Sequence, residues 1–178
     1  TEKIDAVAIN NKIVHIEGEK ARAEAIANLS QEEISAIAEN IAQSKDARSM
    51  LDYLNNFGDK PEIVSSPQIT EAFKKHIVGG NAHMYDIDRI ISLPSISGEI
   101  LKDPAVQKGI QDSIRRFVSY HNSSEWNHVK GAVERVVENG NISNEGLRKI
   151  AESIKGNTDQ YRMFVEHFGA RRLYPELK

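Results

Sequence analysis

The stretch SQEEISAIAENI, residues 30–41, contains the signals that decide the fold. Ser30 and Glu33 have the spacing of a capping box, in which each side chain bonds the other residue's backbone N–H at the start of a helix. Ile34, Ile37 and Ile41 follow at three- and four-residue spacing, which places them on one face of that helix. The stretch therefore predicts an amphipathic helix that buries its isoleucines.

The same pattern recurs three more times along the chain. When counting starts at Leu29, Val64, Leu101 and Ile142, apolar residues coincide at three later positions, and the starts are 35, 37 and 41 residues apart. The coinciding residues are Ile34, Ile69, Val106 and Leu147, then Ile37, Phe73, Ile110 and Ile150, then Ile41, Ile77, Ile114 and Ile154. The first and last copies agree best, since Ser30, Glu32, Ala38 and Met50 also recur as Ser143, Glu145, Ala151 and Met163.

This internal repeat over residues 29–168 resembles the HEAT and armadillo class of helical repeats. Those repeats have a period near 40 residues with two or three helices each. The helix starts at Ser66-Pro67 and Asp103-Pro104 also look like theirs. The resemblance implies an α-solenoid with a wide surface for binding partners. From the residues alone we expect an irregular helical bundle, with a short α-solenoid as the alternative.

The rest of the chain predicts an all-α domain of about eight helices with a small β-hairpin at its N-terminus. Ile4 to Ile9 and Lys12 to Ile16 are rich in β-branched residues and flank Asn10-Asn11, a pair that suits a two-residue turn. An extended arm over residues 1–18 is the alternative. We expect residues 1–178 to form one domain, cut from a longer protein. The predicted core consists of Ile34, Ile37, Ile41, Leu51, Leu54, Phe73, Ile77, Ile110, Ile114, Val129, Val133, Ile150, Ile154, Phe164 and Val165.

Composition limits the classes of function. The net charge of −3 lacks the basic excess of a duplex-binding protein, so nucleic acid is not an expected partner. The absence of cysteine excludes disulfides, thiolate catalysis and cysteine-ligated metals. No apolar run approaches the roughly 18–20 residues of a membrane span, and no signal peptide is visible. The composition suits a cytoplasmic protein as well as one exported into a host cell.

Catalytic signatures are weak. Gly79-Gly80-Asn81 follows a helical pattern, so it predicts a helix stop and not a phosphate loop. His76, His83 and Asp86, or His121 and His128, are the candidate ligands of a metal-dependent hydrolase, but their spacing fixes no geometry. The serines stand mostly at helix starts, where they act as caps. We expect no catalytic residue, metal or cofactor, and we lean towards a non-enzymatic protein.

Arginines and aromatic residues are the candidate binding residues. Arg115 and Arg116 precede Tyr120 and Trp126, and a second pair, Arg171 and Arg172, lies near the C-terminus. Arginine, tyrosine and tryptophan are enriched at protein–protein hot spots; the alternative is that Trp126 is core and the arginines are solvated. We therefore expect a non-enzymatic domain that binds a protein through a helical surface. The second hypothesis is a secreted bacterial effector that regulates a host switch protein, as guanine-nucleotide exchange factors do; a hydrolase is third, and small-molecule binding stays open.

Overall fold

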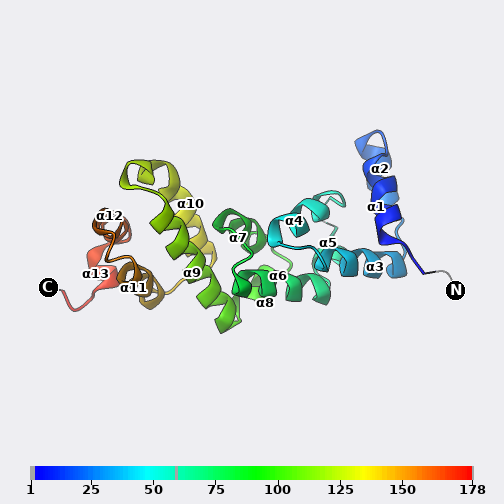
Figure 1. Ribbon diagram of the computed structural model, residues 1–178. Coiled ribbons are helices and arrows are strands. Elements are labelled where there is room, and N and C mark those ends of the chain that lie inside the picture. Colours follow the sequence, from blue (N-terminus) through cyan, green and yellow to red (C-terminus); the bar gives the residue numbers. More distant parts are fainter. Residues whose placement is uncertain (1–2, 59, 178) are drawn as a thin grey trace.

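A computed structural model describes residues 3–58 and 60–177, and within them helices are the only regular secondary structure. In these described residues, thirteen α-helices and one short 3-10 helix, η1, follow one another along an elongated array, and the chain's two ends lie at opposite ends of it (Figure 1). The helices are α1 (Ala6–Val14), α2 (Glu19–Ala27), α3 (Gln31–Ala42), α4 (Ala47–Asn55), α5 (Pro61–Val64), α6 (Pro67–Gly79), α7 (Met84–Ile91), α8 (Ser97–Leu101), α9 (Pro104–Tyr120), η1 (Ser123–Glu125), α10 (Trp126–Asn139), α11 (Asn144–Ser153), α12 (Thr158–Phe168) and α13 (Ala170–Leu173).

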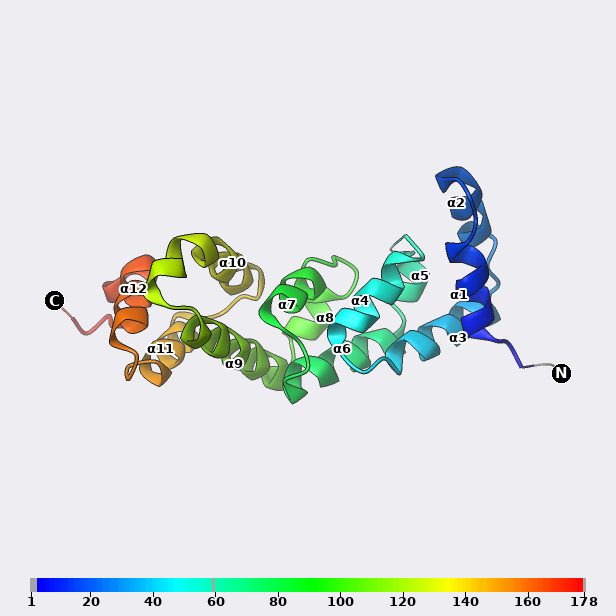
Figure 2. The same cartoon turned by 45° about the horizontal axis from the view of Figure 1, so that its top comes forward.

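The longer helices stack in two rows. In the first row α3 packs on α6, α6 on α9 and α9 on α11; in the second, α4 packs on α7 and α7 on α10. Both views show the second row lying over the first (Figures 1 and 2). The first-row helices are those that open the four sequence repeats. The chain therefore stacks its repeats along one axis, a layout of the solenoid kind and unlike the irregular bundle we expected.

Side-chain caps start three of the four first-row helices where the sequence indicates, whereas Ser66 before α6 forms no side-chain cap bond. The Ser30 hydroxyl accepts a hydrogen bond from Glu33 N at 3.1 Å, and Glu33 Oε1 accepts one from Ser30 N at 2.9 Å. Asp103 accepts from Ala105 N at 2.9 Å before α9, and Ser143 accepts from Gly146 N at 3.0 Å before α11. Each cap satisfies a backbone N–H that has no partner within its helix.

The repeated apolar positions form the core between the rows. All twelve coinciding residues of the four repeats are buried. Of the predicted core residues only Val165 is partly exposed; it packs against the same cluster. Burying one such side chain stabilises a fold by about 1.5–3 kcal/mol. The burial of these repeated apolar residues is therefore the main contribution that holds neighbouring units together.

Three ion pairs join the second-row helices. Arg48 of α4 lies 3.4 Å from Asp86 of α7, and Arg135 of α10 lies 3.3 Å from Asp88 of α7. Arg89 of α7 reaches back to Asp52 of α4 at 3.7 Å. Helix α7 is thereby tied to both of its neighbours in the row.

The predicted N-terminal β-hairpin is wrong. Residues 6–14 form α1, and Asp5 caps it by accepting a hydrogen bond from Ala8 N at 3.1 Å. Ala6 and Ile13 are buried, Ile9 packs beside them, and α1 contacts α3. This packing outweighs the strand preference of the β-branched residues, a preference that spans only about 1 kcal/mol.

The expected count of about eight helices is also too low. The eight predicted helices correspond to α3, α4, α6, α7, α9, α10, α11 and α12. The remaining ones are α1 and α2 at the N-terminal end and the four- or five-residue helices α5, α8 and α13. Helices this short contain about one turn, so they show no periodicity in the sequence. None of the described helices is both long and apolar enough to span a bilayer.

Candidate functional site

A pocket of about 420 Å³ lies where the turn between α6 and α7 meets one face of α9. Helix α9 supplies four lining residues at three- and four-residue spacing, and the turn and the first residue of α7 supply the others. The lining consists of Gly80, Ala82, His83, Met84, Ser113, Arg116, Phe117 and Tyr120. The pocket therefore joins two neighbouring repeat units near the middle of the array.

Aromatic and imidazole rings surround the pocket. Phe117 is buried, and the rings of His83 and Tyr85 meet it edge-on at centroid distances of 5.8 and 5.4 Å. The His121 ring also contacts Phe117, at a centroid distance of 4.3 Å, and the Tyr120 ring meets His121 edge-on at 5.3 Å. Tyr120 is 85% exposed. The Tyr120 ring therefore stands exposed at the edge of the pocket, next to the buried Phe117.

Arg116 supplies the positive charge of the pocket. Its side chain lies over Gly80, where an added Cβ would be 3.9 Å from Arg116 Nη2. No aspartate or glutamate lines the pocket. No carboxylate of the described residues lies within 4.0 Å of the Arg116 guanidinium either. The guanidinium is therefore available to a partner from solution.

The backbone at the start of α7 is already satisfied. His83 Nδ1 accepts a hydrogen bond from Tyr85 N at 3.3 Å, and Asp86 Oδ2 accepts one from His83 N at 3.2 Å. Asp86 is buried and its other oxygen faces Arg48. This network positions the His83 ring, which meets Phe117 edge-on, and it leaves both Asp86 oxygens engaged by His83 N and Arg48.

The predicted binding residues separate into several places. Arg116 and Tyr120 meet at the pocket. Arg115 points to the other side of α9, where it lines a small hollow of about 110 Å³ beside α11. Trp126 is only 8% exposed and packs edge-on against His167 at 5.6 Å. Its indole therefore belongs to the core, as the alternative interpretation held, and not to the pocket.

The C-terminal arginines lie on α13, at the end of the array and away from the pocket (Figure 1). Arg171 is exposed, and Arg172 donates a hydrogen bond to Asn144 Oδ1 at 2.6 Å. Beside them Tyr174 is buried, accepts a hydrogen bond from Tyr161 and donates one to Glu152. Burial and these two contacts raise the pKa of Tyr174 above its usual value. This network fastens the last helix onto α11 and α12.

The candidate metal ligands are not gathered into one site. His76 Nε2 contacts the Ser44 carbonyl at 3.2 Å, while His83 and Asp86 serve the cap of α7. His121 Nδ1 donates to the Phe117 carbonyl at 2.9 Å, and His128 is exposed on α10. Across the described ranges, no three His, Asp or Glu side chains lie close enough together to hold a metal ion.

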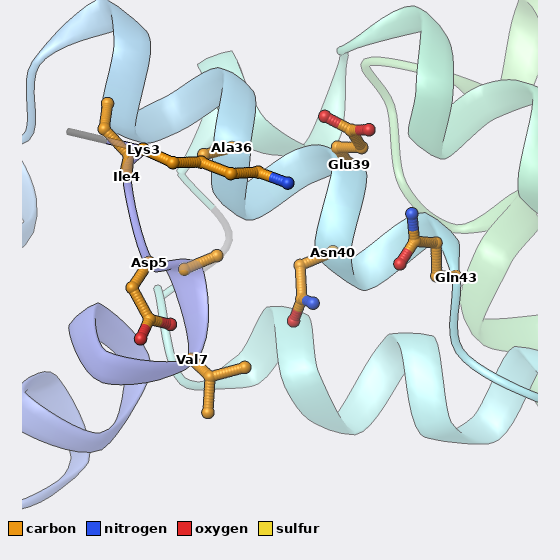
Figure 3. A pocket seen from close by; sticks show the side chains of 9 residues that line it. Lys3, Ile4, Asp5, Val7, Ala36, Glu39, Asn40 and Gln43 are labelled. Atoms are coloured by element: carbon orange, nitrogen blue, oxygen red, sulfur yellow. The ribbon is translucent and has the colours of Figure 1, made fainter. Parts of the chain in front are cut away.

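A second hollow of about 430 Å³ lies at the N-terminal end, between residues 3–7 and α3 (Figure 3). Lys3 extends across it towards the side of Glu39, and Asn40 projects from α3 below. Charges of both signs line it, and Asp5 and Asn40 are already engaged by Ala8 N and by the Tyr53 hydroxyl. Unlike the Arg116 pocket, it is lined by acidic as well as basic side chains and by no aromatic residue.

Sequence reasoning missed part of the pocket. The sequence marks His83 only as a candidate metal ligand, and it gives no separate signal for Tyr85, Met84 or Ser113. The spacing of Ser113, Arg116, Phe117 and Tyr120 marks one face of α9, a signal that was present in the sequence. The contact between α7 and α9 carries no comparable local signal, because it depends on how successive units stack.

No protein-family model, curated protein or solved structure matches this chain.

Proposed function

We propose that this chain is a non-enzymatic protein-binding domain that recognises its partner at the pocket between α7 and α9. The observation that carries the proposal is the exposed Tyr120 ring beside the unpaired Arg116 guanidinium, above a hollow walled by Phe117 and His83. Tyrosine and arginine provide large contact areas and directional hydrogen bonds, and they dominate binding energy at protein interfaces.

The shape of the array supports the same proposal. Stacked helical repeats form extended surfaces on which a partner segment contacts several units. Here the pocket spans two units. The second-row ion pairs and the buried apolar residues of the four repeats hold those units together. A preformed pocket of this kind loses little conformational entropy on binding.

A displayed library of random peptides, selected on the immobilised domain, tests the proposal. We expect the enriched peptides to lose at least about tenfold in affinity for Tyr120→Ala, as expected for a hot-spot residue. Leu177→Ala is the matched control, since it removes an exposed apolar side chain at the far end of the array. Enriched peptides that bind the Tyr120 variant as well as the parent would contradict the proposal.

Arg171→Glu tests the competing C-terminal surface in the same experiment. If the peptides respond to Arg171→Glu and not to Arg116→Glu, the binding surface is α13 and the pocket is not the site. Both arginines are exposed, so both variants should fold, and a circular-dichroism melt of each verifies this.

A further inference from the structure

A groove with an excess of basic side chains lies on the side of α9 that faces α11, away from the candidate pocket. Two hollows of about 530 and 110 Å³ both reach Gln111, Asp112 and Lys149, so they are continuous with each other. Among the described residues, their charged lining consists of one acid, Asp112, and the cations Lys102, Lys108, Arg115 and Lys149. The groove therefore suits a ligand with negative charge.

Within the described ranges, Lys108 and Arg115 are the two cations of the groove that form no ion pair. No carboxylate there lies within 4.0 Å of either side chain. Lys102, by contrast, is paired with Glu99 at 3.8 Å at one end of the groove. The positive charge available to a ligand is thus concentrated at two points along α9.

The middle of the groove is negative instead. Asp112 lies between Lys108 and Arg115 in the sequence of α9. On the α11 side, Lys149 is paired with Glu145 at 3.6 Å. Asp112, Lys149 and Glu145 together carry one net negative charge, so a carboxylate placed between the two free cations would be repelled.

The groove is polar, and its two sides are fixed against each other. Gln107 Nε2 donates to the Leu101 and Gly140 carbonyls at 3.1 and 2.9 Å. Gln111 lies over Gly146 of α11, where an added Cβ would be 2.8 Å from Gln111 Nε2. Unlike the candidate pocket, the groove has no aromatic lining, so its ligand is recognised mainly by charge.

The spacing of the two free cations defines the shape of that ligand. Lys108 and Arg115 are seven residues apart, which is about 10.5 Å along α9 and almost two full turns, so both lie on one face. An extended chain of the polyproline II type places residues three apart on one face, about 9.3 Å from each other. A flat β-strand would direct the same two residues to opposite faces. Two carboxylates three residues apart in a polyproline II-like segment therefore match the two cations.

We infer that this groove binds an extended segment of a partner protein that carries two carboxylates three residues apart, with uncharged side chains between them. The carboxylates pair with Lys108 and Arg115, and the uncharged residues pass Asp112. A nucleic-acid strand fits less well, because its charges follow one another without a gap and meet the negative middle of the groove. This surface is separate from the pocket of the proposed function and does not depend on it.

Titration of the ¹⁵N-labelled domain with three peptides tests the inference. The matching peptide is acetyl-Gly-Glu-Ser-Ser-Glu-Gly-amide, its isomer with adjacent acids is acetyl-Gly-Ser-Glu-Glu-Ser-Gly-amide, and the third has glutamine in place of both glutamates. The matching peptide should shift the amide signals of Lys108, Gln111 and Arg115 and bind about threefold to tenfold more tightly than its isomer. The glutamine peptide should not saturate these shifts, and added salt should weaken the binding of both acidic peptides.

Three variants assign the preference to named side chains. Lys108→Gln and Arg115→Gln should each abolish it, whereas Lys20→Gln, the matched control on exposed α2 at the far end of the array, should leave it intact. Asp112→Asn removes the repulsion in the middle of the groove, so the isomer should then bind about as tightly as the matching peptide.

Equal affinities of the two acidic peptides for the parent domain would overturn the inference, as would a preference that survives both Lys108→Gln and Arg115→Gln. Tyr120→Ala separates this result from the proposed function: it should leave the binding of the matching peptide unchanged, and a loss would place that peptide in the candidate pocket. Hexathymidylate serves as the competing polyanion. If it shifts the same signals and binds more tightly than the matching peptide, the groove is a nucleic-acid site and the inference fails.

Discussion

Gly109 of α9 lies directly against the backbone of Ile77 in α6. A Cβ atom added to Gly109 would be 2.8 Å from the Ile77 carbonyl oxygen and 3.0 Å from its Cγ2. The first-row helices of the second and third units thus approach each other so closely that the position accepts only hydrogen. The candidate pocket is formed by the same two units. The contact between Gly109 and Ile77 therefore also fixes the distance between the α6–α7 turn and α9, which line the pocket.

Gly109→Ala should therefore destabilise the domain by about 1–3 kcal/mol, the usual cost of overpacking a tight core. The atoms that an added Cβ would meet belong to the Ile77 main chain, so the clash is removed only if a whole helix shifts. Alanine's better helix propensity, at most about 1 kcal/mol, acts in the opposite direction. Urea unfolding followed by circular dichroism measures the difference.

Gly131→Ala in α10 is the matched control for that measurement. Its added Cβ would meet only Arg135 Nη1 at 3.9 Å, and the residue is exposed. The same substitution should here stabilise the protein by about 0.5–1 kcal/mol. Equal effects at the two glycines would show that α6 and α9 are not in backbone contact.

The ion pairs of the second row should contribute very unequally. Asp86 has a side chain only 7% exposed, pairs with Arg48 and accepts the His83 N–H. Asp86→Ala should cost about 1–3 kcal/mol, because it leaves the His83 N–H without its acceptor. Asp52→Ala removes the partner of Arg89 from a side chain that is 66% exposed, and should cost about 0–1 kcal/mol. Similar losses of unfolding free energy in the two variants would contradict this assignment.

The first-row helices were predictable because their signals are local. Ser30 with Glu33, and Ser143, both cap where the pattern indicates, and the isoleucines that follow are buried. The N-terminal helix was missed because Val7, Ile9, Ile13 and Val14 favour strands by small amounts. Two signals pointed the other way: Asp5 as a cap, and the helical spacing of Ala6, Ile9 and Ile13.

The pocket was only half predictable for a related reason. Arg116 and Tyr120 stand four residues apart on one helix, so their proximity follows from the helical repeat. His83 reaches Phe117 only because α7 stacks on α9, a contact between separate units. Trp126 was predicted to bind a partner because tryptophan is enriched at interfaces. Its position at the start of α10 instead places the indole in the core.

Acid should weaken the start of α4. Hydrogen bonds from the Ser49 N–H, at 2.8 Å, and from its hydroxyl hold the pKa of Asp46 below its usual value. A lowered folded-state pKa means that the ionised carboxylate stabilises the fold above the unfolded-state pKa. That contribution disappears as the pH falls through the folded-state value.

Asp46→Ser tests this because serine caps a helix without a charge. Its melting temperature should lie below that of the parent near neutral pH, and the gap should narrow as the pH falls below the ordinary pKa of an aspartate. Ser143→Ala, which removes an uncharged cap from α11, should lower the melting temperature by an amount that does not change over this range. A gap for Asp46→Ser that persists at low pH would exclude a role for the charge.

Phe117 and Tyr120 should separate folding from binding, although they are three residues apart on α9. Phe117→Ala removes a buried ring that contacts His83, Tyr85 and His121, and should cost about 3–5 kcal/mol. Tyr120→Ala removes a ring that is almost fully exposed, and should change stability by no more than about 0.5 kcal/mol. If the Tyr120 ring serves recognition, its removal lowers peptide affinity at unchanged stability. A stability loss comparable to that of Phe117→Ala would instead place Tyr120 among the residues that hold α9 on its neighbours, and the exposed surface of the pocket would lose its main recognition element.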